Sequence, residues 1–183
     1  MAHEIYLSWQ ETVPGRGSAD GRKLLSVLYH QVTGQTMPEL IREPGGKPRF
    51  TAGPWHCSIS HTRQAVFCAL SLTPIGLDAE PLNRQVGERI MERALSPMEQ
   101  VRLGDYPTKA EGFLTHWVLK EAYGKYTGHG IRGNPAELDF RVAGDRAQLT
   151  GERQWFMLRR FFGHILAICR AEPGEIVVIS GNS

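Results

Sequence analysis

The stretch Ile75-Gly76-Leu77-Asp78-Ala79-Glu80 lies near the middle of the chain and predicts a short strand between two prolines. The same order of elements, a helix, a loop and a buried apolar strand, occurs before it and after it. The apolar runs that end the two series are residues 66–70 and 166–171. This repeated order of elements favours an α+β fold of two similar halves, 1–78 and 79–183. The halves are expected to pack as one unit, with the site at the seam where they meet. An ordinary α+β chain without a repeat also fits the pattern.

Hydrophobic spacing and turn residues predict the remaining elements. Helices are expected at about 18–32, at 83–94, from Ser96 onward and at 108–126. Ser96-Pro97-Met98-Glu99 combines a capping box with a proline at the first helical position. Strands are expected at 4–9, 65–72, 75–80, 137–142, 154–160, 163–171 and 176–179. Residues 38–53 are expected to be rich in loops.

Composition and charge restrict the classes to which the protein can belong. The 183 residues are 41% hydrophobic, which is enough for a core and argues against a disordered chain. The formal net charge of +2 argues against a nucleic-acid-binding module and suits one small anionic ligand better.

Cysteine usage and the start of the chain indicate a compartment. The three cysteines lack C-x-x-C spacing and lie among apolar neighbours, which predicts reduced core residues. Residues 1–9 lack the pattern of a signal peptide, and no apolar run reaches membrane-spanning length. We therefore expect a soluble, cytoplasmic protein without membrane association.

Asp78 and Glu80 are the first candidate functional residues. They are two positions apart, so on a strand both side chains point to the same face. Two adjacent carboxylates are suitable ligands for Mg²⁺, which binds hard oxygen atoms and often bridges to a substrate phosphate. A solvated strand face next to Pro81 is the alternative interpretation.

The helix expected at 108–126 carries a second group of candidates. One stripe at three- and four-residue spacing begins apolar and then bears a carboxylate and an ammonium group: Leu114, Trp117, Val118, Glu121 and Lys125. An ordinary surface Glu–Lys pair is the alternative, but it does not need a tryptophan one turn earlier on the same line.

Two loop segments could bind phosphate. Gly45-Gly46-Lys47-Pro48 would hold a lysine on a tight turn, and Ser60-His61-Thr62 offers hydroxyl and imidazole groups. A solvated turn lysine and a structural histidine are the ordinary alternatives. A serine–histidine nucleophile pair is disfavoured, because neighbouring strand residues face opposite ways and no G-x-S-x-G motif is present.

Taken in order, these segments resemble the 4'-phosphopantetheinyl transferase superfamily over about residues 21–131. The segments that match its motifs are Gly45-Gly46-Lys47-Pro48, Ser58-Ile59-Ser60-His61-Thr62, Ile75-Gly76-Leu77-Asp78-Ala79-Glu80, Trp117-Val118-Leu119-Lys120-Glu121-Ala122-Tyr123-Gly124-Lys125 and Gly128-His129-Gly130-Ile131. The length and the paired halves resemble the single-chain, pseudo-dimeric branch with a pseudo-two-fold fold. Cys57-Ser58 departs from the aromatic residue and asparagine that are usual there, and the last fifty residues match no motif of the family.

The resemblance implies a reaction and a set of site residues. The 4'-phosphopantetheine group of coenzyme A would be transferred to a serine of an acyl or peptidyl carrier protein, and 3',5'-ADP would leave. Mg²⁺ would be bound by Asp78, Glu80 and Glu121, with Glu121 and Lys125 as the catalytic residues. The residues implied to bind coenzyme A are Arg22, Lys47, Ser60, His61, Lys120 and Lys125.

The resemblance also implies partners and leaves two rival functions open. The carrier protein should be acidic, and a pseudo-dimer should act as a monomer. One rival is a magnesium-dependent hydrolase of coenzyme A-type pyrophosphates. The other is a carrier-protein-binding paralogue that performs no transfer.

Overall fold

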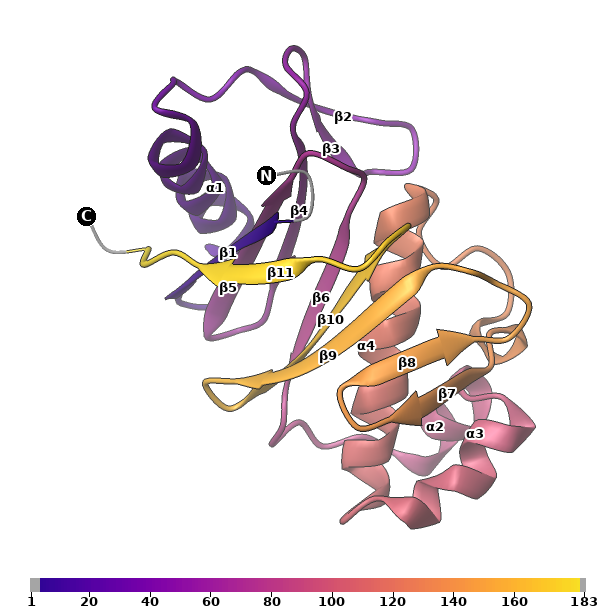
Figure 1. The fold of residues 1–183 in the computed structure, drawn as a ribbon. Coiled ribbons are helices and arrows are strands. Elements are labelled where there is room, and N and C mark those ends of the chain that lie inside the picture. Colours follow the sequence, from indigo (N-terminus) through magenta and orange to yellow (C-terminus); the bar gives the residue numbers. More distant parts are fainter. Residues whose placement is uncertain (1–3, 182–183) are drawn as a thin grey trace.

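The protein is described by a computed structural model for residues 4–181 and has an α+β fold (Figure 1). Its helices are α1 (Gly17–Thr33), α2 (Glu88–Ala94), α3 (Pro97–Arg102) and α4 (Lys109–Thr127), with two 3-10 turns, η1 (Leu103–Asp105) and η2 (Pro135–Glu137). Its strands are β1 (Glu4–Glu11), β2 (Leu40–Arg42), β3 (Pro48–Phe50), β4 (His56–His61), β5 (Ala65–Ser71), β6 (Gly76–Pro81), β7 (Phe140–Ala143), β8 (Arg146–Leu149), β9 (Trp155–Phe161), β10 (His164–Arg170) and β11 (Glu175–Val178).

Two sheets repeat one topology, which confirms the α+β class and the two similar halves. The first has strand order β11-β1-β5-β4 and the second β6-β10-β9-β8-β7. Within them, β1-β5-β4 corresponds to β6-β10-β9, and every neighbouring pair of these strands is antiparallel. In each half the helix, α1 or α4, lies in the sequence between the first strand and the hairpin. The repeat is therefore one of topology, related by a pseudo-two-fold.

Strand alternation sorts the side chains into three core clusters. Along β5, alternate residues face either α1 or the space between the two sheets. Along β6, Leu77 and Ala79 enter the core between the sheets. Asp78 and Glu80 consequently point to the other face of β6, on the side of α4. The α4 side of the second sheet holds its own core cluster, which includes Leu114, Val118 and Ala122 from the helix.

Two serine side chains join the edge strands of the two sheets. The hydroxyl of Ser58 accepts a hydrogen bond from the backbone N–H of Leu77 at 2.9 Å, and that of Ser60 accepts one from Ala79 at 3.2 Å. Strand β4 of the first sheet thus lies beside β6 of the second without a backbone ladder between them. Polar atoms thus join the halves at this edge, whereas apolar side chains fill the space between the two sheets.

The boundary between the halves remains a proposal. A division after residue 78, into 1–78 and 79–183, would cut through β6, so we propose to place it before Gly76. Strand β11 comes from the end of the chain but pairs in parallel with β1 of the first sheet, so the two halves interlock. Residues 1–3 and 182–183, the ends of these halves, lie outside the described residues.

Several predicted elements differ from the observed ones. The helix expected at 83–94 begins only at Glu88. The stretch 38–53 contains the short hairpin β2–β3, and β4 was not predicted as a strand. Within residues 4–181, no helix combines the length and the apolar character that a membrane crossing requires.

Candidate active site

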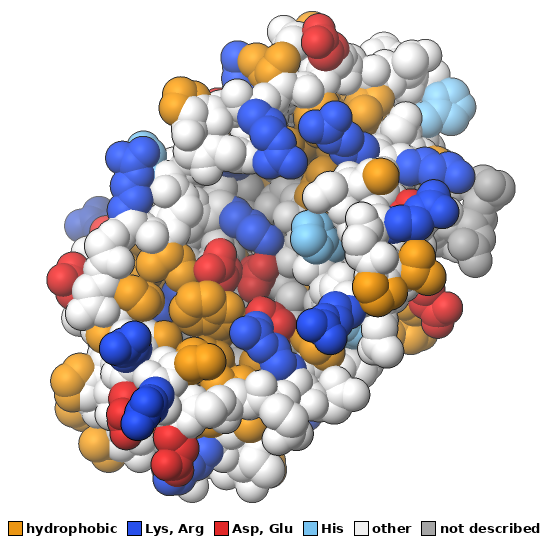
Figure 2. Space-filling model, turned by 180° about the vertical axis from the view of Figure 1, so that it is seen from behind, with side chains coloured by type: hydrophobic (Ala, Val, Ile, Leu, Met, Phe, Trp, Pro, Cys, Tyr) orange, Lys and Arg blue, Asp and Glu red, His pale blue; other side chains and the backbone are white. Residues whose placement is uncertain are grey.

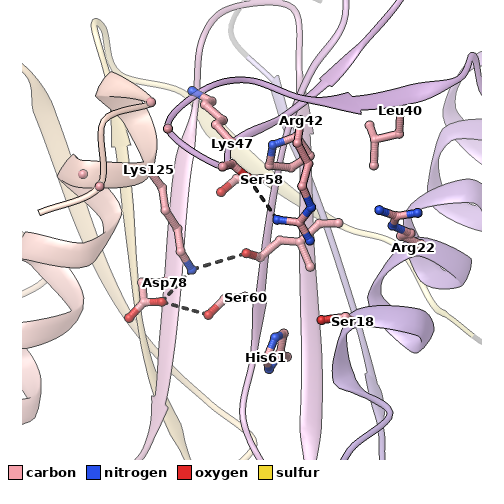
Figure 3. Close-up of a pocket in the computed structure, with 17 residues that line it drawn as sticks. Ser18, Arg22, Leu40, Arg42, Lys47, Ser58, Ser60, His61, Asp78 and Lys125 are labelled. Carbon is pink, nitrogen blue, oxygen red and sulfur yellow. Dashed lines mark hydrogen bonds and ion pairs between the residues drawn. The ribbon is translucent and has the colours of Figure 1, made fainter.

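A pocket of about 360 Å³ opens at the seam between the halves (Figure 3). Its walls come from α1, the β2–β3 hairpin, β4, β6, α4 and the loop that follows α4. Six of the residues predicted for the site line it: Arg22, Lys47, Ser60, His61, Asp78 and Lys125. The pocket thus brings together side chains from both halves of the chain.

Asp78 forms the acidic end of the pocket and is only 6% exposed. Its Oδ1 accepts a hydrogen bond from the Ser60 hydroxyl at 2.8 Å and from Lys125 Nζ at 2.7 Å. Lys125 Nζ also lies 3.3 Å from the carbonyl oxygen of Ile59. The charge of the buried Asp78 is therefore compensated by one ammonium group, which comes from α4.

Glu80 and Glu121 complete a group of three carboxylates. Burial raises the pKa of Glu80, Arg84 acts against this through an ion pair, and the charges of Asp78 and Glu121 raise the pKa further. Burial likewise raises the pKa of Glu121, and Asp78 adds to the effect. Among residues 4–181, no hydrogen bond or ion pair reaches the Glu121 carboxylate. The three carboxylates are thus close enough to repel one another.

These residues have the chemistry of a metal site but are not assembled as one. Across the described part of the chain, no group of three acidic, histidine or cysteine side chains is close enough to hold an ion as it stands. The available donors are all carboxylate oxygens, which suit a hard divalent cation. Because Lys125 occupies Asp78 Oδ1, a cation bound here would have to take over the role of that ammonium group.

The opposite end of the pocket is basic. Lys47 Nζ donates a hydrogen bond to the carbonyl oxygen of Tyr126, in the last turn of α4, at 2.9 Å. Burial lowers the pKa of Lys47, and the charge of Glu43 acts against this. Gly45, two residues before Lys47, must be a glycine, because a Cβ at this position would lie 1.7 Å from the carbonyl oxygen of Gly128. This contact fixes Lys47 over the end of α4.

Arginines from two elements extend the basic end. Arg22 projects from the first turns of α1, and it makes no hydrogen bond or ion pair with other residues of the range 4–181. Arg42, on β2, donates a hydrogen bond to the carbonyl oxygen of Gly46 at 3.1 Å. Sequence reasoning missed Arg42, although its position shortly before the Gly45-Gly46 turn is a usable signal. Ser18 and Ser58 also line the pocket and were not predicted as ligands.

The structure contradicts the expectation that Lys120 binds coenzyme A. Lys120 is fully buried behind α4, where its ammonium group contacts Glu99 Oε2 and the carbonyl oxygens of Pro135 and Leu138. It does not line the pocket, because it leaves the helix on a different side from Lys125. Ser60 does line the pocket, but its hydroxyl already bridges Asp78 and the backbone of β6.

The space-filling view shows how this site is exposed. In Figure 2 a hollow on one face contains acidic side chains, and lysine, arginine and histidine side chains lie around it. The acidic side chains in this hollow are thus surrounded by basic ones. Such an arrangement is suited to an anionic ligand bound together with a cation.

Comparison with known proteins identifies the class. The model of the 4'-phosphopantetheinyl transferase superfamily matches residues 74–169, more than half of the chain. The chain therefore belongs to this superfamily.

Two of the proteins to which the chain is similar come from Bacillus species. "4'-phosphopantetheinyl transferase psf-1" of Bacillus pumilus is 29% identical over 138 residues, covering 73% of this chain and 59% of the relative. A 4'-phosphopantetheinyl transferase of Bacillus subtilis is 34% identical over 137 residues, covering 70% and 61%. The chain thus spans about three-fifths of the length of these relatives. A Thermotoga maritima holo-[acyl-carrier-protein] synthase structure aligns with 21% identity and a TM-score of 0.47, covering 55% of this chain and 64% of that one.

Proposed function

We propose that the protein transfers the 4'-phosphopantetheine group of coenzyme A to a serine of an acyl or peptidyl carrier protein and releases 3',5'-ADP. The observation that supports this most directly is the pocket at the seam. It has a basic end suited to the phosphates of a nucleotide and an acidic end formed by Asp78. Glu80 and Glu121 do not line this pocket, but they lie close enough to Asp78 for its charge to raise the pKa of each. The names of the relatives agree with this activity.

The basic end would hold the nucleotide part of coenzyme A. Arg22 has no partner within residues 4–181, so its guanidinium group can pair with the 3'-phosphate. Lys47, Arg42 and His61 also line the pocket and would hold the remaining phosphate oxygens and the base. Ser60 would act through Asp78, whose carboxylate it orients.

The acidic end would bind a divalent metal ion, as is general in this superfamily, and we propose Mg²⁺. Asp78, Glu80 and Glu121 would be its ligands, and the ion would neutralise the charge that develops on the pyrophosphate. Displaced from Asp78, Lys125 would be free to pair with a phosphate oxygen. Burial is the main cause of the raised pKa values of Glu80 and Glu121, and repulsion by neighbouring carboxylates adds to it. A bound cation would relieve this repulsion.

Glu121 is also the proposed base. The carrier serine oxygen attacks the phosphorus that bears the pantetheine arm, the bond from this phosphorus to the bridging oxygen breaks, and 3',5'-ADP leaves with that oxygen. The serine proton passes to Glu121, directly or through a water. Burial raises the pKa of Glu121 and so makes its carboxylate a better proton acceptor.

We further propose an acidic carrier protein as the partner and a monomer acting in the cytoplasm. The basic side chains around the hollow would steer an acidic partner towards the site. The two halves of one chain already form the seam, so a second subunit is not needed to build the pocket.

The direct test is to incubate the protein with coenzyme A, Mg²⁺ and a panel of apo carrier proteins. We expect a mass gain of one phosphopantetheine group on the carrier serine, together with an equal amount of 3',5'-ADP. Release of 3',5'-ADP without a carrier would instead favour a hydrolase. Tight carrier binding without transfer would favour the binding paralogue.

Arg22→Ala should raise the KM for coenzyme A about ten-fold with little change in kcat, because the lost charge pairs with a phosphate that does not react. The variant should also lose the preference for coenzyme A over 3'-dephospho-coenzyme A, measured by steady-state kinetics with both donors. The matched control is Lys23→Ala, which removes the same charge from the next residue, outside the pocket. Equal effects of both substitutions would contradict the assignment of Arg22.

A further inference from the structure

A buried ion pair behind α4 has no part in the pocket. Glu99 of α3 and Lys120 of α4 are both fully buried, and Lys120 Nζ lies 2.6 Å from Glu99 Oε2. Burying two charges costs several kcal/mol per ion, so such a pair often adds no more stability than apolar residues of similar size. The pair therefore needs an explanation other than stability.

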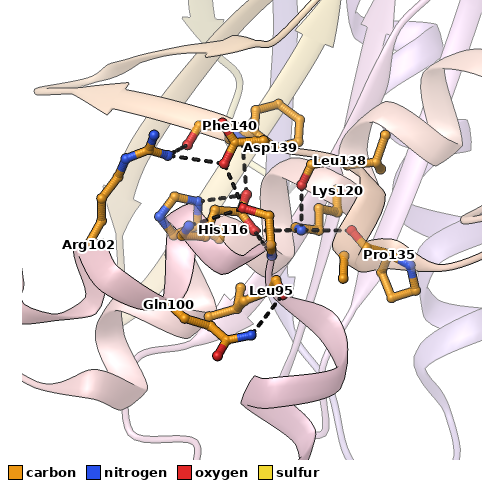
Figure 4. Close-up of polar contacts among 12 residues, drawn as sticks. Leu95, Gln100, Arg102, His116, Lys120, Pro135, Leu138, Asp139 and Phe140 are labelled. Carbon is orange, nitrogen blue, oxygen red and sulfur yellow. Dashed lines mark hydrogen bonds and ion pairs between the residues drawn. The ribbon is translucent and has the colours of Figure 1, made fainter.

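Lys120 has three acceptors for its three N–H groups. Besides Glu99, they are the carbonyl oxygens of Pro135 at 2.8 Å and Leu138 at 2.7 Å (Figure 4). An ammonium group with all its donors used in a buried site has little freedom to move. The side chain thus fixes the segment around η2 against the back of α4.

Glu99 is held as firmly as its partner. It accepts hydrogen bonds from the backbone N–H groups of Ser96 and Phe140, both at 2.9 Å, and His116 Nδ1 lies 3.2 Å from Oε1. Burial alone would raise the pKa of Glu99, but His116 and Lys120 outweigh it and lower the pKa. The carboxylate therefore remains charged and ties α3, α4 and the start of β7 together.

This group connects to the pocket in two ways. Lys120 directly precedes Glu121 on α4, and successive helical residues differ by about 100° in direction. Because Lys120 is fixed on the side of the helix away from the pocket, Glu121 is directed towards β6. The segment 128–138 begins at the pocket wall, with Gly128 and Gly130, and reaches the Lys120 ammonium group at Pro135 and Leu138. One ammonium group thus fixes the rotation of α4 about its axis and also holds the end of segment 128–138 that lies away from the pocket.

We propose that Lys120, held by Glu99, is a positioning residue that places Glu121 and the pocket wall 128–130 for the transfer. The inference rests on the proposed function for its kinetic consequence. Its structural content, the restraint of residues 128–138 by Lys120, is independent of which reaction the pocket performs.

The test begins with Lys120→Met, which keeps the length of the side chain and removes its charge and donors. At a temperature where circular dichroism shows the variant fully folded, kcat/KM for coenzyme A should fall at least about ten-fold, because small displacements of catalytic groups are costly. Amide hydrogen exchange should accelerate in residues 128–138. The matched control is Lys109→Met, at a 70% exposed lysine on the same helix, which should change neither quantity.

A second variant separates positioning from stability. Glu99→Gln combined with Lys120→Met leaves neither member of the pair charged, so it should regain much of the Tm that either single change loses. Its kcat/KM should nevertheless remain low. Recovery of Tm and kcat/KM together would overturn the proposal, as would a folded Lys120→Met variant with unchanged kcat/KM.

Failure of the proposed function would be seen separately. If the wild-type protein transfers nothing to any carrier, the proposed function is wrong, but the exchange measurement still tests the restraint. Unchanged amide exchange in residues 128–138 of Lys120→Met would overturn the inference whether or not the wild-type protein is active.

Discussion

Glu121→Gln is expected to lower turnover at least about 10³-fold while leaving Tm unchanged or higher. The substitution removes a proposed base and metal ligand. General-base catalysis alone typically contributes about 10²–10⁴-fold, and loss of charge stabilisation by the metal ion adds to this. It should not harm the fold, because the Glu121 carboxylate has no partner in residues 4–181 and is repelled by Asp78. Mass-spectrometric transfer assays and thermal unfolding at neutral pH measure the two quantities.

The pH dependence of stability shows why replacing Glu121 by glutamine should not lower Tm. The folded chain raises the pKa of Glu121, so it binds more protons than the unfolded chain between the two pKa values. The free energy of unfolding therefore falls as the pH rises from the unfolded pKa through the folded pKa. Above the folded pKa the penalty is complete, and a glutamine avoids it.

Magnesium should reverse the penalty in the wild-type protein. A cation that binds only the folded state raises Tm, so added MgCl₂ should increase the Tm of the wild type more than that of Glu121→Gln. Glu172→Gln, at an exposed glutamate between β10 and β11, serves as the control and should behave like the wild type. A Glu121→Gln variant that retains turnover and the full magnesium shift would refute the role of this residue.

The parts of the fold that sequence predicted well are those decided by local interactions. Strong periodicity predicted α1 and α4 to within a few residues at each end. The capping box is present, since Ser96 Oγ accepts from the Glu99 N–H and Glu99 Oε2 from the Ser96 N–H. Two-residue alternation also predicted that Asp78 and Glu80 share one face of β6, and in the structure α4 covers this face.

The parts that sequence reasoning missed depend on partners far away in the chain. Strand β4 carries Ser58 and Ser60, whose hydroxyls bond β6 across the seam. Cys57 and Ile59 alternate with these serines, which is a local strand signal, but it is only two apolar residues long and was overlooked. Arg42 was missed because the hairpin that carries it is held over the pocket by contacts with the end of α4.

Lys120 shows why a motif cannot assign each of its residues a role. It directly precedes Glu121, and the pattern alone suggested that both lysines of the motif contact the ligand. Only the partner Glu99, on another helix, shows that the Lys120 ammonium group lies behind α4, while Lys125 lies in the pocket. A buried charge can be recognised from sequence only when its partner is known.

Gly76→Ala is expected to lower the free energy of unfolding by about 3 kcal/mol or more, because it forces α4 away from β6. A Cβ on Gly76 would lie 2.0 Å from the carbonyl oxygen of Ala122 and 2.5 Å from the backbone nitrogen of Tyr126. Both atoms belong to the backbone of α4, so no side-chain rotation relieves the contact. For a chain of this size, thermal unfolding should show Tm lower by about 6–12 °C.

The same displacement should reduce activity in molecules that remain folded. Gly76 precedes Asp78 on the same face of β6, so moving α4 here separates Glu121 and Lys125 from Asp78 and lowers kcat even well below the new Tm. Gly104→Ala is the control: a Cβ there meets no atom within 4 Å, so stability should change by no more than about 0.5 kcal/mol. If Gly76→Ala unfolds at the wild-type temperature with unchanged kcat, the close approach of α4 to β6 does not set the geometry of the site.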